Sequence, residues 1–110
     1  MVKNKKPAKK YIPERGDIVL VFLDSVKGRE QKGARPALVI TPKRYNEKSS
    51  LFGICPITSH KKGYPFEATV LASNTSGVVL VDQLRMYDWE ARSVKKLDSV
   101  SPVTMQTVQD

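Results

Sequence analysis

The side chains best suited to chemistry lie in a polar loop, residues 28–37, between two apolar segments. Its glycines permit tight turns, and four of its side chains are charged, namely Arg29, Glu30, Lys32 and Arg35. Arg35 comes directly before Pro36, which restrains the chain at the root of the next apolar segment. A rigidly held, planar guanidinium suits a phosphodiester, although a mixed-charge surface loop is the simpler interpretation.

Two adjacent hydroxyls, Thr58 and Ser59, follow a second apolar segment. At a strand end such hydroxyls either cap the following loop or donate hydrogen bonds to phosphate oxygens. The spacing along the chain does not show that Arg35 and Thr58 meet in space, so each signal is weak by itself.

Residue counts exclude most metal and nucleophile sites. The chain has one cysteine, Cys55, and one histidine, His60, so an internal disulfide cannot form and a zinc site would need acidic ligands. It has no HExxH, CxxC or Walker motif. We expect Cys55 to be a small buried hydrophobe and His60 to be an exposed loop residue, with a base or phosphate contact as the alternative. We expect no metal and no cofactor.

Composition predicts one globular domain with an excess of positive charge. The chain has 110 residues and a net charge of +8, a length that suits one domain. Residues 1–10 hold five lysines and no acid, and we expect a disordered basic arm, with an electrostatic tether for a polyanion as the alternative. We find no apolar run of the ~20 residues that span a membrane and no secretory signal, so the expected location is the cytoplasm.

Short apolar segments separated by turn residues predict a mainly β fold. Strands are expected at residues 17–23, 36–41, 51–57, 66–71 and 78–81. Residues 83–87 extend the last strand or begin another, and residues 92–97 form a final one. Pro56 suggests an edge strand or a bulge, and Ser101-Pro102 is typical of a helix start, which predicts a short C-terminal helix over residues 103–109. The pattern indicates a small antiparallel barrel or twisted sheet.

Three blocks in the right order across residues 11–97 resemble toxins of the MazF/PemK family. The first has the family's G-D-[IL], K-G-x-E-Q-x-G, R-P, [ST]-P and Y-N motifs, here Gly16-Asp17-Ile18, residues 27–33, Arg35-Pro36, Thr41-Pro42 and Tyr45-Asn46. The second is K-G-Y-P-F-E at residues 62–67, and the third is G-V-x-L-x-D-Q at residues 77–83. Leu80 stands where the PemK branch has an arginine, which favours the MazF branch.

The resemblance implies a fold, an activity and a partner. The fold is an SH3-like antiparallel barrel of the PemK/CcdB type with small helices, over residues 11–110, and it forms a homodimer. The activity is metal-independent, sequence-specific endoribonuclease cleavage of single-stranded RNA, which inhibits translation and growth. A cognate antitoxin with an acidic C-terminal tail neutralises the toxin by occupying the RNA groove, and the toxin–antitoxin complex binds DNA.

The family places its chemistry on the R-P arginine and on a threonine after the third strand, which here are Arg35 and Thr58, with Glu30 as a weaker candidate. General chemistry agrees, because without a metal the nearest nucleophile is the RNA's own 2′-hydroxyl. Arg35 would stabilise charge on the phosphorane and Thr58 would donate a hydrogen bond, giving 2′,3′-cyclic phosphate and 5′-hydroxyl ends. The general base is open between Glu30 and Arg35, since arginine is a poor base in water with a pKa above ~12.

Further RNA contacts are expected from Lys27, Arg29, Ser59, Lys61, Lys62 and Gln83. The cations would position phosphates, while Gln83 would read base edges of an unpaired strand. For the three lysines, a role in solubility is an equally good interpretation. Tyr64 and Trp89 could stack on bases, although Trp89 is better interpreted as a packing residue at a strand corner.

Two other functions suit the same fold. CcdB-type toxins share the barrel but bind a DNA topoisomerase, and a noncatalytic SH3-like module that binds RNA or protein would need no proximity of Arg35 and Thr58. The R-P arginine together with the strand-end threonine favours the nuclease over both alternatives.

Overall fold

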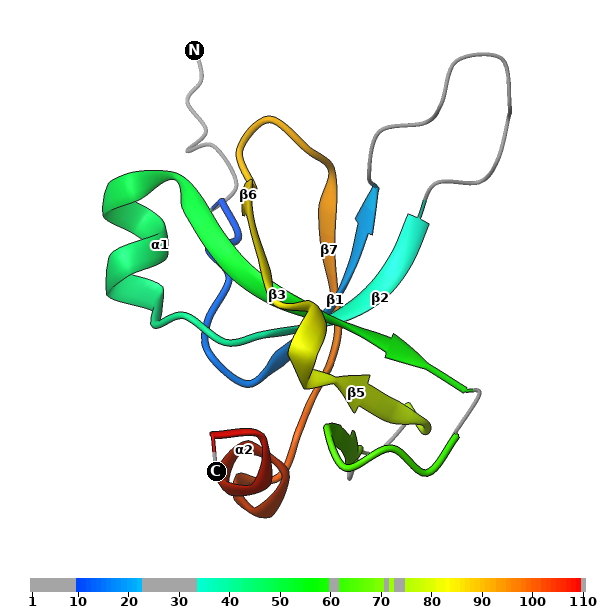
Figure 1. Ribbon diagram of the computed structural model, residues 1–110. Coiled ribbons are helices and arrows are strands. Elements are labelled where there is room, and N and C mark those ends of the chain that lie inside the picture. The colour runs from blue at the N-terminus through cyan, green and yellow to red at the C-terminus, as the bar shows by residue number, and fades with distance from the viewer. Residues whose placement is uncertain (1–9, 23–33, 60–61, 71, 73–74, 110) are drawn as a thin grey trace, which may run out of the picture.

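The computed structural model of the chain describes residues 10–22, 34–59, 62–70, 72 and 75–109 (Figure 1). Its strands are β1 (Asp17–Phe22), β2 (Ala34–Val39), β3 (Leu51–Thr58), β4 (Glu67–Thr69), β5 (Val78–Leu80), β6 (Arg85–Asp88) and β7 (Val94–Ser99). Its helices are α1 (Lys43–Ser49), the 3₁₀ turn η1 (Val81–Gln83) and α2 (Pro102–Gln109). The helix α2 is the short C-terminal helix that the sequence predicts. None of the helices that the structure describes is long and apolar enough to cross a membrane.

The strands form one antiparallel, seven-stranded sheet in the order β4-β5-β3-β2-β1-β7, with β6 also paired to β3. The prediction of a mainly β, antiparallel fold is therefore confirmed. The word barrel fits only loosely, because the end strands β4 and β7 are not paired with each other in the described part of the chain. An isolated antiparallel bridge joins Ala72, which follows β4, to Val100, which follows β7.

Apolar residues on both faces of the central strands account for this sheet. In β1, Ile18 packs into one hydrophobic cluster while Val19 and Val21 pack into another, and all three are fully buried. A continuous β-branched run is what a strand covered on both faces requires. The first cluster is closed by α2 through Val108, so β1 is covered on both faces as far as Val21, whereas Phe22 is exposed.

The strand β3 is central. Of the two expectations for Pro56, an edge strand or a bulge, the edge strand is therefore wrong. It pairs with β2 along one side, and on the other side with β6 at Leu51–Ile54 and with β5 at Ile57–Thr58. Pro56 lies where β3 leaves β6 and meets β5. A residue without an N–H is tolerated there because the ladder on that side is already interrupted.

The start of α2 follows the sequence prediction closely. The Thr104 N–H donates to the Ser101 hydroxyl at 3.3 Å and to the Ser101 carbonyl at 3.1 Å. Ser101 is therefore the N-cap and Pro102 the first helical residue, which needs no N–H of its own.

A buried asparagine holds α1 against the rest of the molecule. Asn46 is fully buried, and its Nδ2 donates to the carbonyl oxygens of Pro13 at 2.8 Å and Thr41 at 3.0 Å. Its Oδ1 accepts from the Thr41 hydroxyl at 2.6 Å, and its main-chain oxygen accepts from Trp89 Nε1 at 2.8 Å. The Thr41 hydroxyl in turn accepts from the Gly53 N–H at 3.0 Å. Through these bonds α1 is tied to the segment before β1, to the segment after β2 and to the residue after β6. The Thr41 hydroxyl extends the network to β3.

A second buried polar residue fixes the N-terminal segment against β1 and β7. Asp17 is buried, and its carboxylate accepts from the Tyr11 hydroxyl and from the Glu14 N–H at 3.1 Å. Lys96 on β7 pairs with it at 3.5 Å. Burial, followed by the Asp17 hydrogen bond and charge, raises the pKa of Tyr11. The aspartate of the G-D motif is thus a structural residue.

We predict that Asn46→Ala lowers the free energy of unfolding by about 3 kcal/mol, because it leaves buried carbonyl groups without donors and creates a cavity. Urea unfolding at fixed protein concentration measures the change. Lys48→Ala, an exposed substitution on the same helix, should stay within about 0.5 kcal/mol of wild type. Equal free energies of unfolding for the two variants would show that the Asn46 hydrogen bonds make no net contribution to stability.

Candidate active site

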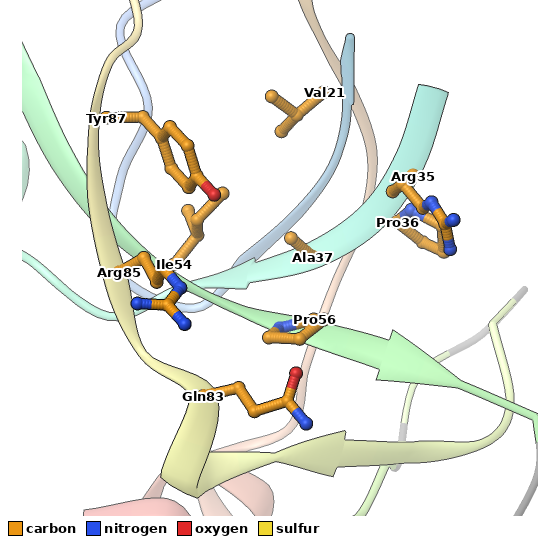
Figure 2. A pocket seen from close by; sticks show the side chains of 9 residues that line it. All are labelled: Val21, Arg35, Pro36, Ala37, Ile54, Pro56, Gln83, Arg85 and Tyr87. Atoms are coloured by element: carbon orange, nitrogen blue, oxygen red, sulfur yellow. The ribbon is translucent and has the colours of Figure 1, made fainter. Parts of the chain in front are cut away.

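Two cavities open beside β3, and both are bordered by Gln83. The first, here the arginine cavity, has a volume of about 290 Å³ and is lined by Val21, Arg35, Pro36, Ala37, Ile54, Pro56, Gln83, Arg85 and Tyr87 (Figure 2). The second, here the threonine cavity, has a volume of about 400 Å³ and is lined by Thr58, Lys62, Tyr64, Phe66, Glu67, Leu80, Asp82 and Gln83.

Strand register places Arg35 and Thr58 at the same end of the β2–β3 pair. Ala37 on β2 pairs with Pro56 on β3 in an antiparallel ladder. Arg35 lies two residues beyond Ala37, and Thr58 lies two residues beyond Pro56. Residues two apart on a strand share a face, so both side chains belong to the face that carries Ala37 and Pro56. The structure therefore brings the two predicted residues to adjoining cavities rather than to opposite sides of the molecule.

Arg35 is exposed and Thr58 is partly buried. Figure 2 shows Arg35 and Gln83 on either side of Pro56, with the Gln83 amide directed toward the space between them. Gln83 ends η1, the turn that carries the chain from β5 to β6. A side-chain amide there can donate and accept, and it borders the cavities that Arg35 and Thr58 line.

The threonine cavity is shaped by a loop that Glu67 closes. The Glu67 carboxylate accepts from the main-chain N–H of Gly63 at 2.9 Å and of Lys62 at 3.0 Å. Within this loop the Tyr64 and Phe66 rings stack with centroids 5.0 Å apart. The glutamate of the K-G-Y-P-F-E motif thereby holds Lys62 and the two rings where they line the cavity.

The predicted site residues are only partly visible. Lys62 and Gln83 line a cavity, whereas Ser59 is exposed and lines neither of the two. Four predicted residues lie outside the described part of the chain, namely Lys27, Arg29, Glu30 and Lys61. His60 lies outside it as well, and so do residues 1–9 of the predicted basic arm, residues 1–10. The last residue of that arm, Lys10, is described and pairs with Glu90 at 3.0 Å.

Sequence reasoning missed Arg85 and Tyr87, which line the arginine cavity from β6. The signal was present as an alternation, because residues 83–87 read Q-L-R-M-Y and place the two side chains on one face. Leu84 and Met86 lie on the other face, against Gly53 of β3. Of residues 83–87, which are expected to extend one strand or begin another, only Gln83 is predicted from the sequence to contact RNA.

Other candidate groups have structural roles. Cys55 is buried, and burial followed by the charge of Asp82 raises the pKa of its thiol to about 11, so it is not a nucleophile at neutral pH. Trp89 is buried and donates to Asn46, which confirms it as a packing residue. In the described ranges, no cluster of three or more His, Cys, Asp or Glu side chains is placed to hold a metal ion.

The arginine cavity offers a guanidinium and an amide around an apolar floor, and the Thr58 hydroxyl belongs to the second cavity, which shares Gln83 with the first. Val21, Ala37 and Ile54 form that floor and belong to the hydrophobic core. Cations beside apolar surface suit a ligand that combines phosphates with flat bases, such as a single nucleic-acid strand.

Comparison with known proteins agrees with this geometry. The model of the family described as PemK-like, MazF-like toxin of type II toxin-antitoxin system matches residues 14–110. The chain is 39% identical over 100 residues to the endoribonuclease toxin MazF of Escherichia coli (strain K12), covering 91% of this chain and 90% of that protein.

Solved structures agree as well. Crystalline MazF (Form-I) from Deinococcus radiodurans matches with a TM-score of 0.79 and 40% identity, over 91% of this chain and 92% of that one. The MazE-MazF structure (Form-II) from the same organism matches with a TM-score of 0.78 and 38% identity, over 91% and 90%. With this sequence, this sheet and this coverage, the chain belongs to the PemK-like, MazF-like toxin family of type II toxin–antitoxin systems.

Proposed function

We propose that this protein is an endoribonuclease toxin that cleaves single-stranded RNA at a short sequence motif without a metal ion. The observation that carries the proposal is the placement of Arg35 and Thr58 at one end of the β2–β3 pair, beside cavities that share Gln83. The relatives named as endoribonucleases support the same reaction. The proposed location is the cytoplasm, and the proposed assembly is a homodimer.

The reaction needs no external nucleophile. The 2′-oxygen of one nucleotide attacks the adjacent phosphorus, the bond from phosphorus to the 5′-oxygen breaks, and a 2′,3′-cyclic phosphate and a 5′-hydroxyl result. Arg35 stabilises the negative charge that grows on the phosphoryl oxygens, and Thr58 donates a hydrogen bond to one of them. A base removes the 2′-proton and an acid supplies a proton to the 5′-oxygen.

The remaining roles follow from position and charge. Lys62 beside Thr58 contacts a phosphate, and Gln83 contacts a base edge between the two cavities. Lys27, Arg29, Ser59 and Lys61 are proposed RNA contacts on sequence grounds alone. Solved relatives include MazE-MazF complexes, and an acidic antitoxin tail that lies along Arg35 and Arg85 would exclude RNA by competing for the same cations.

We predict that Arg35→Ala lowers kcat for RNA cleavage by about 10²- to 10³-fold, because a preorganised cation no longer meets the transition state. The assay uses single-stranded RNA in EDTA and scores 2′,3′-cyclic phosphate ends.

Arg44→Ala is the matched control, since it removes the same charge from an exposed position on α1 that lines neither cavity. It should cleave like wild type. Intact RNA with the wild-type protein, or equal loss in both variants, would contradict the proposal.

We predict that Thr58→Val, which keeps the side-chain shape and removes the hydroxyl, lowers kcat at least tenfold with little change in KM. Thr58→Ser should restore most of the rate because it restores the donor. Thr69→Val, at an exposed position of β4, is the control. Full activity of Thr58→Val would remove this hydroxyl from the mechanism.

Glu30 is proposed as the general base, on sequence grounds alone. Glu30→Gln should lower kcat by about 10²-fold and leave KM unchanged, because glutamine keeps the size of the side chain but cannot accept the 2′-proton. Glu47→Gln on the exposed side of α1 should have no effect. Wild-type turnover by Glu30→Gln would assign proton removal to another group, Arg35 first.

A further inference from the structure

We propose that the arginine cavity is a subsite for one unpaired RNA base, in which Tyr87 stacks on the base and Arg85 holds the phosphate beside it. This inference rests on the proposed function, because it requires RNA to pass Arg35. It assigns a role to the two cavity residues that the catalytic proposal does not use.

The floor of the cavity is apolar and already built. Val21, Ala37 and Ile54 are 0%, 3% and 5% exposed as residues, yet they line the cavity. Pro36 and Pro56 add further apolar surface. The volume of about 290 Å³ lies just below the range for small-molecule pockets. The cavity therefore suits one flat base rather than a longer stretch of RNA.

Tyr87 is held in place before any ligand arrives. It is partly buried and packs against the core cluster that contains Val21 and Ile54. The Arg92 guanidinium carbon lies over the Tyr87 ring, 4.7 Å from its centroid, and Arg92 does not line the cavity. Figure 2 shows the ring directed into the cavity above Ile54. A fixed aromatic ring is a stacking surface that costs little ordering entropy to use.

Arg85 supplies charge on the side of β3 away from Arg35. It pairs in register with Ile54, whereas Arg35 extends from the strand on the other side of β3. None of the described residues that line this cavity carries a carboxylate, and the guanidinium-bearing residues Arg35 and Arg85 both lie on its wall. An RNA backbone that places a base on the floor would bring its phosphate to Arg85.

The base contact is tested by coupling a protein change to an RNA change. The wild-type cleavage motif is mapped first, and an abasic nucleotide is then placed at each position around the cleaved bond. With wild-type protein, one position should lose about 5- to 150-fold in kcat/KM, the range expected for a stacked base. With Tyr87→Leu, the loss at that same position should shrink to less than twofold, because the stacking surface is already absent.

Two further variants keep the result interpretable. Tyr87→Phe retains the ring and should retain the full abasic penalty, which also checks that position 87 tolerates substitution. Tyr45→Leu, at an exposed tyrosine of α1, should behave like wild type. If the abasic penalty shrinks in Tyr87→Phe as it does in Tyr87→Leu, the Tyr87 hydroxyl and not the ring makes the contact, and stacking is overturned.

The phosphate contact is tested by salt dependence. The RNA probe carries the cleavage motif with a single 2′-deoxy nucleotide at the cleaved position, so that it binds without reacting. Arg85→Gln should weaken binding by a similar factor at every sequence and reduce the slope of log Kd against log salt by about 0.7, the value for one single-strand phosphate. Arg44→Gln should leave the slope unchanged.

The outcomes separate the two proposals. The base subsite is overturned if wild type cleaves RNA but the abasic penalty shrinks at no position in Tyr87→Leu. It is also overturned if Tyr87→Leu lowers kcat/KM by the same factor whichever position is abasic. Either result leaves the proposed nuclease activity unaffected. An unchanged salt slope in Arg85→Gln overturns the phosphate contact. Failure of the wild-type protein to cleave any RNA overturns the proposed function and this subsite with it.

Discussion

The position of the site depends on the buried amide of Asn46. Its side chain donates to two carbonyl oxygens and accepts from the Thr41 hydroxyl, which itself accepts from the Gly53 N–H. Only an amide or a similarly amphoteric group can donate and accept in this way without a charge. Because Thr41 follows β2, Gly53 lies in β3 and Trp89 follows β6, this one network sets the relative placement of the strands that carry Arg35, Thr58 and Arg85. In a low-dielectric interior such a network favours one arrangement strongly.

The family motifs therefore divide into residues of the frame and residues of the site. Asp17, Asn46 and Glu67 each use a polar side chain to bind main-chain groups of the chain itself. Arg35 and Gln83 instead line cavities. A polar residue in a motif is thus no evidence of contact with substrate until its hydrogen-bond partners are known.

Sequence reasoning found the elements whose signal is local. The β-branched run of β1 and the Ser101-Pro102 start of α2 follow from propensity and capping alone. The helix α1 was missed because K-R-Y-N-E-K-S has no apolar stripe, and Asn46 is its only buried residue. Periodicity cannot reveal a helix that packs through one polar side chain. Arg85 was missed for a related reason, since its relevance depends on β6 pairing with β3, a contact between distant parts of the chain.

The exposure of Arg35 to water connects the proposed cleavage chemistry with the proposed base subsite, because Arg35 lines the cavity that would hold the base. Two unit charges 4 Å apart interact by about 1 kcal/mol in bulk water and by about 4 kcal/mol at the lower effective dielectric constant near a protein surface, so the interaction strengthens as water is excluded. Arg35, the cation proposed to act in catalysis, is exposed in the free protein, where water screens its charge. A base seated on Val21, Ala37 and Ile54 would displace water from the wall that Arg35 shares. Filling that cavity would strengthen the field at the phosphate, so recognition of the base and acceleration of the cleavage would draw on the same desolvation.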